Sequence, residues 1–295
     1  MSLETCFSSD SDINDMVQDF PSYLSERCLV IDEALERYLP PEDRYPEIIH
    51  RAMRYSVLNG GKRVRPVLML AACEAVGGDQ QRILPAACAI EFIHAFSLIH
   101  DDLPALDNDD FRRGKPTSHK VFGEAMAILA GDGLLALAFE TLAMTEVSPE
   151  LLIQATARIA SAAGIGGMIV GQVADIISEG KTVEPETLQF IHRNKTGALI
   201  QASVYCGGLL GGGNQRRLQA LDLYGEKIGL AFQIADDILD IGEEGKATYP
   251  SLYGLEKSQE LAKQAVDDAT TALDDFGPYA DPLRALARFI IERKA

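Results

Sequence analysis

Residues 83–107 read ILPAACAIEFIHAFSLIHDDLPALD, and this stretch decides the fold. Its first part is apolar on nearly every side, and it is interrupted only by Glu91, His94 and His100 before the aspartates begin. A helix that is apolar all round lies inside a larger protein. We therefore expect residues 83–102 to form a helix in the centre of the fold, ending in a cluster of carboxylates.

A second run of carboxylates, Asp236-Asp237-Ile238-Leu239-Asp240, closes another apolar stretch. Asp236 and Asp240 are four residues apart, and Asp237 and Asp240 are three apart. Helical geometry sets side chains at these spacings on one face. We predict that this run is helical and presents its carboxylates together.

The first cluster needs a turn to bring its carboxylates together. Pro104 should end or kink the helix near Leu103, so Asp107 returns toward Asp101 outside the helical repeat. Two carboxylates in a partly buried site repel each other by about 4 kcal/mol at ~4 Å and an effective dielectric near 20, so they need cations. Oxygen ligands favour Mg²⁺, which bridges carboxylates to substrate phosphates. Either cluster alone could be a solvated acidic helix end, whereas two clusters with matching apolar lead-ins favour a cage for metal ions and a polyanion.

The composition favours one helical domain. The chain has 295 residues, of which 47% are hydrophobic, and it has no Trp, while Ala, Leu and Glu recur throughout. These are helix-forming residues, and this length supplies a sizeable core. We find no stretch of linker composition, so we expect a disordered lead at residues 1–15 followed by a single all-α domain at residues 16–295.

Charge and cysteine content restrict the partners and the compartment. The formal net charge of −17 opposes binding to nucleic acid or to anionic membranes, which require a positive field. The five cysteines form no C-x-x-C pair and favour a reducing, cytoplasmic location. The acidic N-terminus does not resemble a signal peptide, and no 18-residue stretch lacks a charged or polar interruption. We expect a protein without stable membrane insertion.

Further helices follow from apolar periodicity and from breakers such as Pro40-Pro41 and Asn59-Gly60-Gly61. Beyond the central helix we expect helices at 16–58 (two, joined by a short loop), 67–76, 124–144, 149–178, from 184 through 197, 215–241, 251–275 and 281–294. Thr196-Gly197 predicts an irregularity inside its helix, which would free backbone carbonyls to face a ligand. The glycine-rich segment Gly207 to Gly213 is interpreted as a flexible surface turn.

Several motifs, in this order along residues 45–255, together resemble the trans-isoprenyl diphosphate synthase family, the polyprenyl synthetases that make farnesyl and geranylgeranyl diphosphate. No one of them is specific alone. They are Gly60-Gly61-Lys62-Arg63-Val64-Arg65-Pro66, His100-Asp101-Asp102 through Asp107 with Arg112-Arg113-Gly114, Lys195-Thr196-Gly197, Phe232-Gln233 with Asp236-Asp237-Ile238-Leu239-Asp240, and Gly245-Lys246 before Thr248-Tyr249-Pro250.

The resemblance implies a polyprenyl synthetase domain over residues 16–295, folded as an isoprenoid-synthase helical bundle around a central apolar cavity. It implies a homodimer that condenses isopentenyl diphosphate with allylic diphosphates (dimethylallyl, geranyl), using three Mg²⁺ ions to ionise the allylic substrate. Asp101 and Asp107 are ligands by this similarity, with Asp236 leading the second set. The complete set of implied metal ligands is Asp101, Asp102, Asp107, Asp236, Asp237 and Asp240.

The resemblance also divides the basic residues between two diphosphates. The allylic diphosphate would meet Arg112, Lys195 and Lys246, and isopentenyl diphosphate, which binds without metal, would meet Lys62, Arg65, His94 and Arg113. Thr196, Gln233 and the backbone at Lys195 are the family's candidates for stabilising the carbocation. Without these motifs, His94 on an apolar helix would be interpreted as a core histidine.

Product length is implied by the residues before Asp101. Phe96 lies five residues earlier, roughly 7.5 Å down the helix axis at 1.5 Å per residue, and Ser97 shares a face with Asp101. In this family an aromatic residue at the first position forms the floor of the chain tunnel, which predicts the fifteen-carbon farnesyl diphosphate. Geranylgeranyl diphosphate stays open as the alternative product.

Two other functions and one unusual loop remain to be considered. A terpene cyclase would carry Ser or Thr at Asp240 and has no use for the isopentenyl diphosphate pocket, and a noncatalytic metal-binding or regulatory subunit would have lost its aspartates. Between Asp240 and Lys246 the family usually carries a longer polar loop with a further lysine, whereas five residues stand here. The loop is either deleted or incompletely represented in this sequence. We favour the second explanation and expect a mobile lid there.

Overall fold

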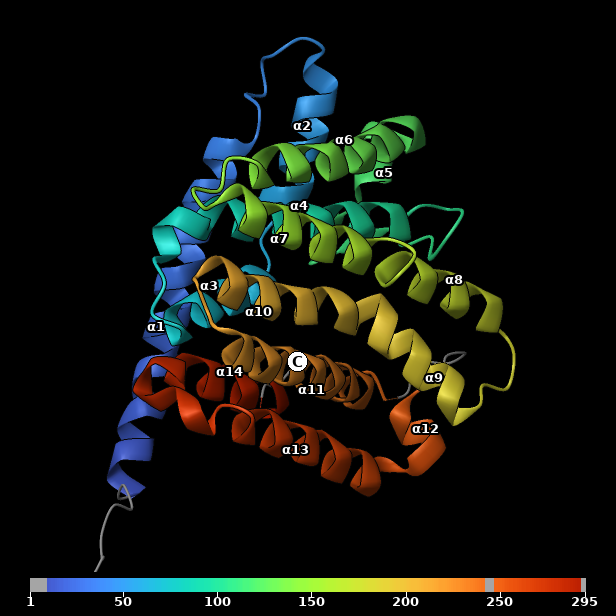
Figure 1. Ribbon diagram of the computed structural model, residues 1–295. Helices are drawn as coiled ribbons and strands as arrows, with labels where there is room; N and C mark the ends of the chain where they lie inside the picture. The colour runs from blue at the N-terminus through green and yellow to red at the C-terminus, as the bar shows by residue number, and fades with distance from the viewer. Residues whose placement is uncertain (1–9, 242–246, 293–295) are drawn as a thin grey trace, which may run out of the picture.

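The computed structural model describes residues 10–241 and 247–292, with side chains from Phe20 onward. Helix α4 (Gln80–Asp101) runs through the middle of a helical bundle (Figure 1), and nearly all its residues from Ile83 to Ile99 are buried or half-buried. The expectation of an all-α fold with this helix at its centre is confirmed. Within the described ranges, the only strands are a two-residue pair, β1 (Phe111–Arg112) and β2 (Lys115–Pro116).

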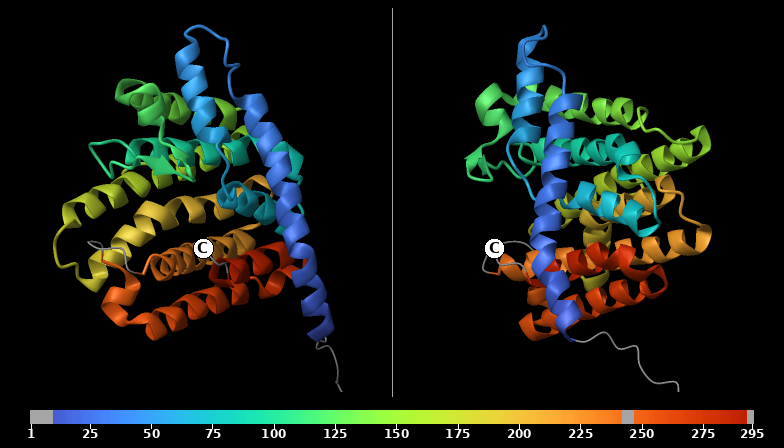
Figure 2. Two further views of the ribbon diagram at one scale, coloured as in Figure 1. Left: turned by 180° about the vertical axis from the view of Figure 1, so that it is seen from behind. Right: turned by 90° about the vertical axis from the view of Figure 1, so that its left-hand side faces the viewer.

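The remaining helices pack around α4 in roughly parallel and antiparallel rows, while the long first helix crosses the ends of several others (Figure 2). They are α1 (Asp10–Tyr38), α2 (Glu47–Leu58), α3 (Val64–Ala75), α5 (Ser118–Phe122), α6 (Glu124–Leu142), α7 (Pro149–Ala163), α8 (Met168–Ser178), α9 (Pro185–Ile191), a π turn (His192–Gly197), α10 (Ala198–Leu210), α11 (Gln215–Leu239), α12 (Tyr249–Tyr253), α13 (Leu255–Thr271), a 3₁₀ segment (Asp274–Ala280) and α14 (Asp281–Glu292).

The two aspartate clusters lie at the same end of the bundle. Helices α4 and α11 run in the same direction, so their C-terminal ends meet the same side of the molecule (Figure 1). The π turn, which joins α9 to α10, confirms the irregularity predicted at Thr196-Gly197. π turns are rare and occur frequently at functional sites. The fold therefore brings three sequence-distant segments to one place.

Three expectations about helix boundaries are corrected. Helix α1 begins at Asp10, inside the segment predicted as a disordered lead, and acidic residues in a first turn favour helix initiation; residues 1–9 lie outside the described part of the chain. The helix expected at 149–178 divides at Gly164–Gly167, where a Cβ on Gly167 would lie 2.2 Å from the carbonyl oxygen of Ala162. The helix expected at 251–275 divides at Gly254, whose φ of 80° favours glycine.

The interpretation of Gly207 to Gly213 as a surface turn is wrong for its first half. Gly207 and Gly208 are buried inside α10. A Cβ on Gly207 would lie 2.1 Å from the carbonyl oxygen of Met69, so the missing side chain allows α10 to pack directly on α3. The turn itself begins only at Gly211.

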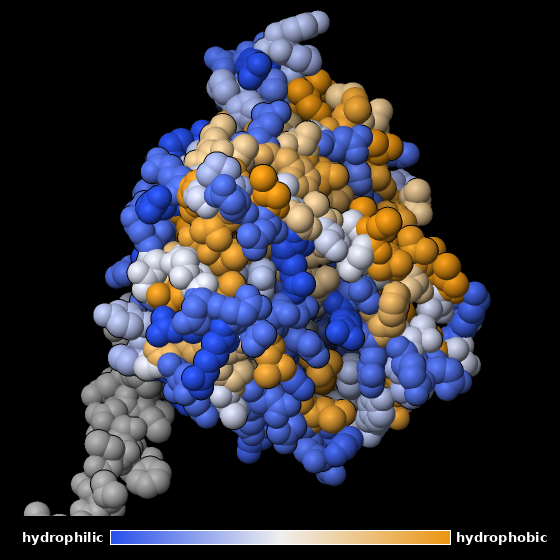
Figure 3. All heavy atoms as spheres, viewed as in Figure 1, coloured by the Kyte–Doolittle hydropathy of each residue, from blue (hydrophilic) through white to orange (hydrophobic). Residues whose placement is uncertain are grey.

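Three stretches are long and apolar enough to cross a membrane by length and composition alone: Gln80–Asp101, Glu124–Leu142 and Pro149–Ser178. In the first, 78% of the most apolar window is buried, so its composition is explained by the core. The other two are 44% and 33% buried, and α8 exposes Ile169, Val173 and Ile177. The space-filling view shows the hydrophobic surface over this helix (Figure 3).

Candidate active site

The first aspartate cluster closes through a turn, as predicted. The backbone N–H of Asp107 donates to the carbonyl oxygen of Asp101 at 2.8 Å. The pKa of the Asp101 carboxyl is raised to about 6, chiefly by burial and also by the negative charges of Asp107 and Asp102, against the opposing effect of Lys195 and Arg112. This carboxylate is poorly solvated and repelled by its neighbours, which is the environment in which a bound cation stabilises it.

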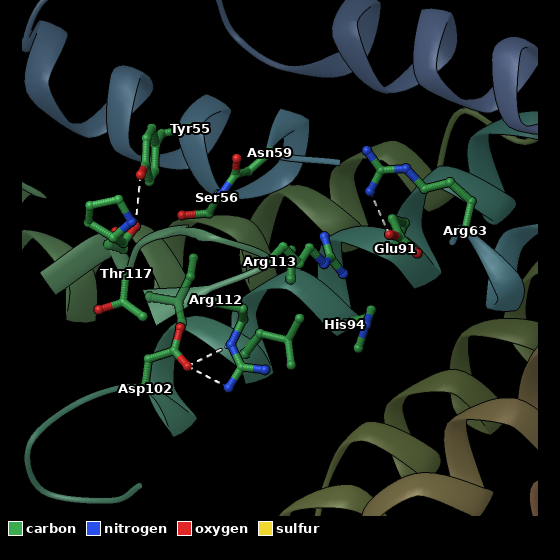
Figure 4. Close-up of a pocket in the computed structure, with 15 residues that line it drawn as sticks. Tyr55, Ser56, Asn59, Arg63, Glu91, His94, Asp102, Arg112, Arg113 and Thr117 are labelled. Carbon is green, nitrogen blue, oxygen red and sulfur yellow. Dashed lines mark hydrogen bonds and ion pairs between the residues drawn. The ribbon is translucent and has the colours of Figure 1, made fainter. Parts of the chain in front are cut away.

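Asp102 differs from Asp101 because it already has a cationic partner. Its side chain is buried, and Arg112 Nε donates to its Oδ1 at 2.6 Å, while Arg112 Nη2 also lies 3.3 Å from Asp109 Oδ2. Figure 4 shows the Arg112 guanidinium turned toward this carboxylate. A metal ion bound to Asp102 would have to share the carboxylate with Arg112. The structure thus gives Asp102 a different environment from its neighbour Asp101.

The second cluster does not present all three carboxylates to one space. Asp236 lines a cavity of about 860 Å³, and Asp237 and Asp240 line a neighbouring cavity of about 200 Å³. The reason is that Asp237 is drawn into the protein. Its Oδ1 accepts from Gln233 Nε2 at 3.1 Å, and its Oδ2 accepts from the backbone N–H of Tyr249 at 2.8 Å.

Asp237 therefore acts as an anchor in this structure. Burial raises its pKa to about 6, and His192 Nε2 lies 3.6 Å from its Oδ2, with the His192 ring stacked on Tyr249 at 5.5 Å between centroids. The contact between His192 and Tyr249 was not predicted, because a buried contact between residues so far apart leaves no local pattern in the sequence. A metal-ligand role for Asp237 would have to disturb hydrogen bonds to both its oxygens.

Lys195 projects from the π turn between the clusters. Its Nζ donates to Asp175 Oδ2 at 2.7 Å, and the negative charges of Asp175, Asp101 and Asp107 raise its pKa despite the opposing effect of burial. The ammonium group is therefore held in its charged form. No role was predicted for Asp175 on α8, and the structure makes it the residue that positions Lys195.

Thr196 and Gln233, the other two residues expected near the carbocation, line the 200 Å³ cavity together with Lys195. Thr196 also borders the larger cavity, so the π turn lies between the two spaces. The Nε2 of Gln233 is committed to Asp237, which fixes the orientation of the amide group. Its oxygen is thus the end of the amide available to a substrate.

The four residues predicted to bind isopentenyl diphosphate all line the 860 Å³ cavity: Lys62, Arg65, His94 and Arg113. Arg65 Nη1 lies 3.4 Å from His94 Nε2, and Arg113 donates to the carbonyl oxygen of Gly60. Burial and the adjacent Arg65 charge hold the pKa of His94 well below its usual range, so the imidazole is neutral. Five cations line this cavity against two carboxylates, Glu91 and Asp236, so positive charge is in excess there, which suits a polyanion.

Arg63 fixes the loop that carries these cations. The residue is buried with a φ of 47°, and its guanidinium bonds Asp32 at 2.8 Å, Glu91 at 2.7 Å and the carbonyl oxygen of Val57 at 2.8 Å. Figure 4 shows this contact reaching the central helix at Glu91. In the sequence, Arg63 is one of three neighbouring cations, whereas in the structure its contacts hold the loop against α1, α2 and α4.

We predict that Glu91→Ala lowers the free energy of unfolding by about 3–5 kcal/mol, because it leaves the buried Arg63 charge without its strongest partner. Chemical denaturation with a two-state fit measures this. The matched control is Glu36→Ala, which removes a largely exposed partner of Arg54 and should cost about 1 kcal/mol or less. Equal losses in the two variants would contradict a buried structural ion pair.

The residues predicted to control product length lie on α4. Phe96 is buried, with its ring edge-to-face against His100 at 5.7 Å between centroids. Ser97 Oγ donates to the carbonyl oxygen of His94 at 2.9 Å. Lys246, and the short segment in which we expected a lid, lie outside the described residues.

The donor set fits magnesium. Among the residues that the structure describes, no three His, Cys, Asp or Glu side chains form a ready-made cage. Mg²⁺ does not require one, because it keeps several waters and binds through one or two carboxylates plus substrate phosphates. The poorly solvated Asp101 carboxylate with Asp107 behind it supplies such oxygens.

Comparisons with known proteins show the family of this chain. A family model described as polyprenyl synthetase matches residues 46–275. A chloroplastic geranylgeranyl pyrophosphate synthase of Capsicum annuum is 46% identical, with 93% of this chain and 79% of the relative covered. A geranylgeranyl diphosphate synthase of Cyanophora paradoxa is 45% identical, with 92% and 96% covered. The solved apo structure of an FPP/GFPP synthase from Zymomonas mobilis superposes with a TM-score of 0.88 at 41% identity, covering 93% of this chain and 99% of that one.

The fold is all-α, and the site brings two aspartate clusters together with several cations. The chain belongs to the polyprenyl synthetase family and is a trans-prenyltransferase. The resemblance inferred from the motifs is confirmed.

Proposed function

We propose that this enzyme condenses isopentenyl diphosphate with dimethylallyl and geranyl diphosphates, and that farnesyl diphosphate is its main product. The observation that carries the proposal is the pairing of two separate polyanion environments. One lies between the aspartate clusters beside Lys195, and the other is the cationic cavity of Arg65, His94 and Arg113. A synthase needs both, whereas a terpene cyclase or a noncatalytic subunit has no use for the second.

Two groups of residues serve the ionisation of the allylic diphosphate: one binds the leaving diphosphate, and the other stabilises the cation. Asp101, Asp107 and Asp236 would hold Mg²⁺, which neutralises the allylic diphosphate as it leaves. Lys195 adds a fixed positive charge to that leaving group, and Arg112, held by Asp102, adds another. The Gln233 oxygen and the backbone of the π turn would stabilise the allylic cation without trapping it, because neither is a strong nucleophile.

The second substrate completes the reaction. Isopentenyl diphosphate, bound by Lys62, Arg65, His94 and Arg113, presents its double bond to the cation. A carbon–carbon bond forms, and a proton leaves to the released pyrophosphate. The neutral His94 donates a hydrogen bond in this arrangement but is not required to take the proton.

Product length rests on Phe96, whose ring lies below the first cluster on α4. A second candidate product is geranylgeranyl diphosphate, because the Capsicum and Cyanophora relatives carry that name at 45–46% identity. Chromatography of the products made from isopentenyl diphosphate with each allylic primer distinguishes the two. A product that forms without consumption of isopentenyl diphosphate would instead indicate a cyclase.

We predict that Arg65→Ala raises the KM for isopentenyl diphosphate by about 10- to 100-fold, since a charge-assisted contact of about 1.5–3 kcal/mol is lost. The KM for geranyl diphosphate should change less than about threefold. Arg112→Ala is the reciprocal variant and should show the larger effect on the allylic substrate. Steady-state kinetics with each substrate varied in turn measures both, and equal effects on the two substrates would show that the pockets are wrongly divided.

We further propose a homodimer that uses the apolar surface of α6 and α8. Ile128, Leu129, Ile169 and Val173 are each more than 40% exposed there, and a second copy of the chain would cover them. Sedimentation analysis tests this assembly. The cytoplasmic location, predicted from the cysteines and the acidic N-terminus, stays a prediction, and several of the relatives are named as chloroplastic.

A further inference from the structure

A third cavity, which we call the back cavity, opens behind the active site and has a volume of about 470 Å³. Its floor is apolar and is formed by α11, α12 and α13. Polar and charged side chains from α9 to α13 stand around it. The apolar lining residues are Leu230, Ile234, Tyr249, Tyr253, Leu261 and Ala265. This volume is within the range of cavities that bind small molecules.

The back cavity shares a wall with the active site. At four elements, neighbouring residues face the two spaces alternately: Thr196 and Gln233 line the 200 Å³ active-site cavity, while Gly197 and Ile234 line the back cavity. The same alternation holds at 188/189, 192/193 and 248/249. Among the described residues, none lines both of these cavities. The same segments of α9, the π turn, α11 and the start of α12 therefore form the wall between the two cavities.

The back cavity offers one cation to an anionic ligand. Of the three cations that line it, Arg193, Lys227 and Lys257, the last is paired with Glu260 at 2.8 Å. Lys227 is paired with Asp268 at 3.0 Å. Arg193 is exposed, and no hydrogen bond or ion pair to another described residue holds it. A guanidinium beside an apolar floor suits a ligand with one anionic group and an apolar body.

Tyr249 gives the back cavity a direct connection to the active site. Its ring lines the back cavity and stacks on His192, while its backbone N–H holds Asp237, which in turn orients Gln233. A ligand that displaces this ring therefore acts on the amide expected to face the carbocation. Gly197, which also lines the back cavity, ends the π turn that carries Lys195.

The geometry points to the back cavity as a second ligand site, which binds a small amphipathic monoanion and lowers turnover by shifting the wall that carries Lys195 and Gln233. Binding itself depends only on the cavity. The effect on turnover rests on the proposed roles of those two residues, so the two parts are measured separately.

The binding test uses the fluorescent probe anilinonaphthalene sulfonate, which joins one sulfonate to an apolar ring system, with the full-length enzyme and no substrate. We expect Arg193→Glu to weaken the Kd about tenfold. Lys263→Glu is the matched control, since it makes the same charge change on an exposed face of α13 that does not line the cavity, and should leave the Kd within about twofold. Ala265→Leu, which fills the floor, should also weaken binding. Equal affinities in all of these variants would overturn the site.

The coupling test adds the probe to the working enzyme. Turnover should fall with KM unchanged for both substrates, and Arg193→Glu should shift the inhibition curve to about tenfold higher probe concentration. Competition with either diphosphate would place the probe in the active site and overturn the proposal. Binding at the back cavity without any change in turnover would overturn the coupling. An enzyme that binds the probe but makes no prenyl product would instead contradict the proposed function.

Discussion

Asp101→Ala should lower kcat by about 1,000-fold or more, with the protein still folded. The carboxylate is the most strongly perturbed member of the first cluster, with a pKa raised to about 6 by burial and by Asp107 and Asp102. That environment favours a bound cation, and the leaving diphosphate depends on the same cation as its charge develops. Removing one such electrostatic contact in an enzyme costs about 10²–10³ in rate, and loss of a metal ligand should reach the upper end.

Single-turnover kinetics at saturating magnesium measures this loss in the chemical step. Asp267→Ala is the matched control, because Asp267 is an exposed aspartate on α13 and should leave kcat within about twofold. Calorimetric titration with magnesium and pyrophosphate should show weakened binding in Asp101→Ala and normal binding in the control. Near-normal turnover of Asp101→Ala would contradict the leaving-group role of the first cluster.

The parts of the fold that could be predicted are those with a local signal. The central helix is apolar on all sides, the π turn interrupts a helix at Thr196-Gly197, and Pro104 sends Asp107 back to Asp101. Each of these depends on residues close together in the chain. The helix expected at 149–178 divides at Gly164–Gly167, and this division depends on how closely the chain passes Ala162.

The sequence predicted which residues belong to the candidate site, but not which of their side chains bond to one another. The spacing of the aspartates does not show which of them has a protein partner, yet Asp102 is held by Arg112 and Asp237 by Gln233 and Tyr249. Which carboxylate stays available to a metal is decided by contacts between segments that no periodicity relates. For the same reason the contact of Asp175 with Lys195 could not be predicted.

Phe96→Ala should change the main product from fifteen to twenty or more carbons. The ring is buried on α4 one turn below the first cluster, packed against His100, and a growing chain that starts at the aspartates must pass it. Removing the ring opens a space of side-chain size along that path. Ionisation should be little affected, because no diphosphate or metal contact involves Phe96 in the proposed arrangement.

Two controls separate product length from stability. Phe96→Tyr keeps the ring and should keep the fifteen-carbon product, while Phe276→Ala creates a cavity in a buried site far along the chain and should not alter product length. Both alanine variants should lose about 3–5 kcal/mol of folding stability, the usual cost of a buried Phe→Ala change. Chromatography of dephosphorylated products compares all four enzymes at equal conversion. If the wild type already makes mainly the twenty-carbon product and Phe96→Ala leaves it unchanged, then Phe96 is ordinary core packing and geranylgeranyl diphosphate is the product.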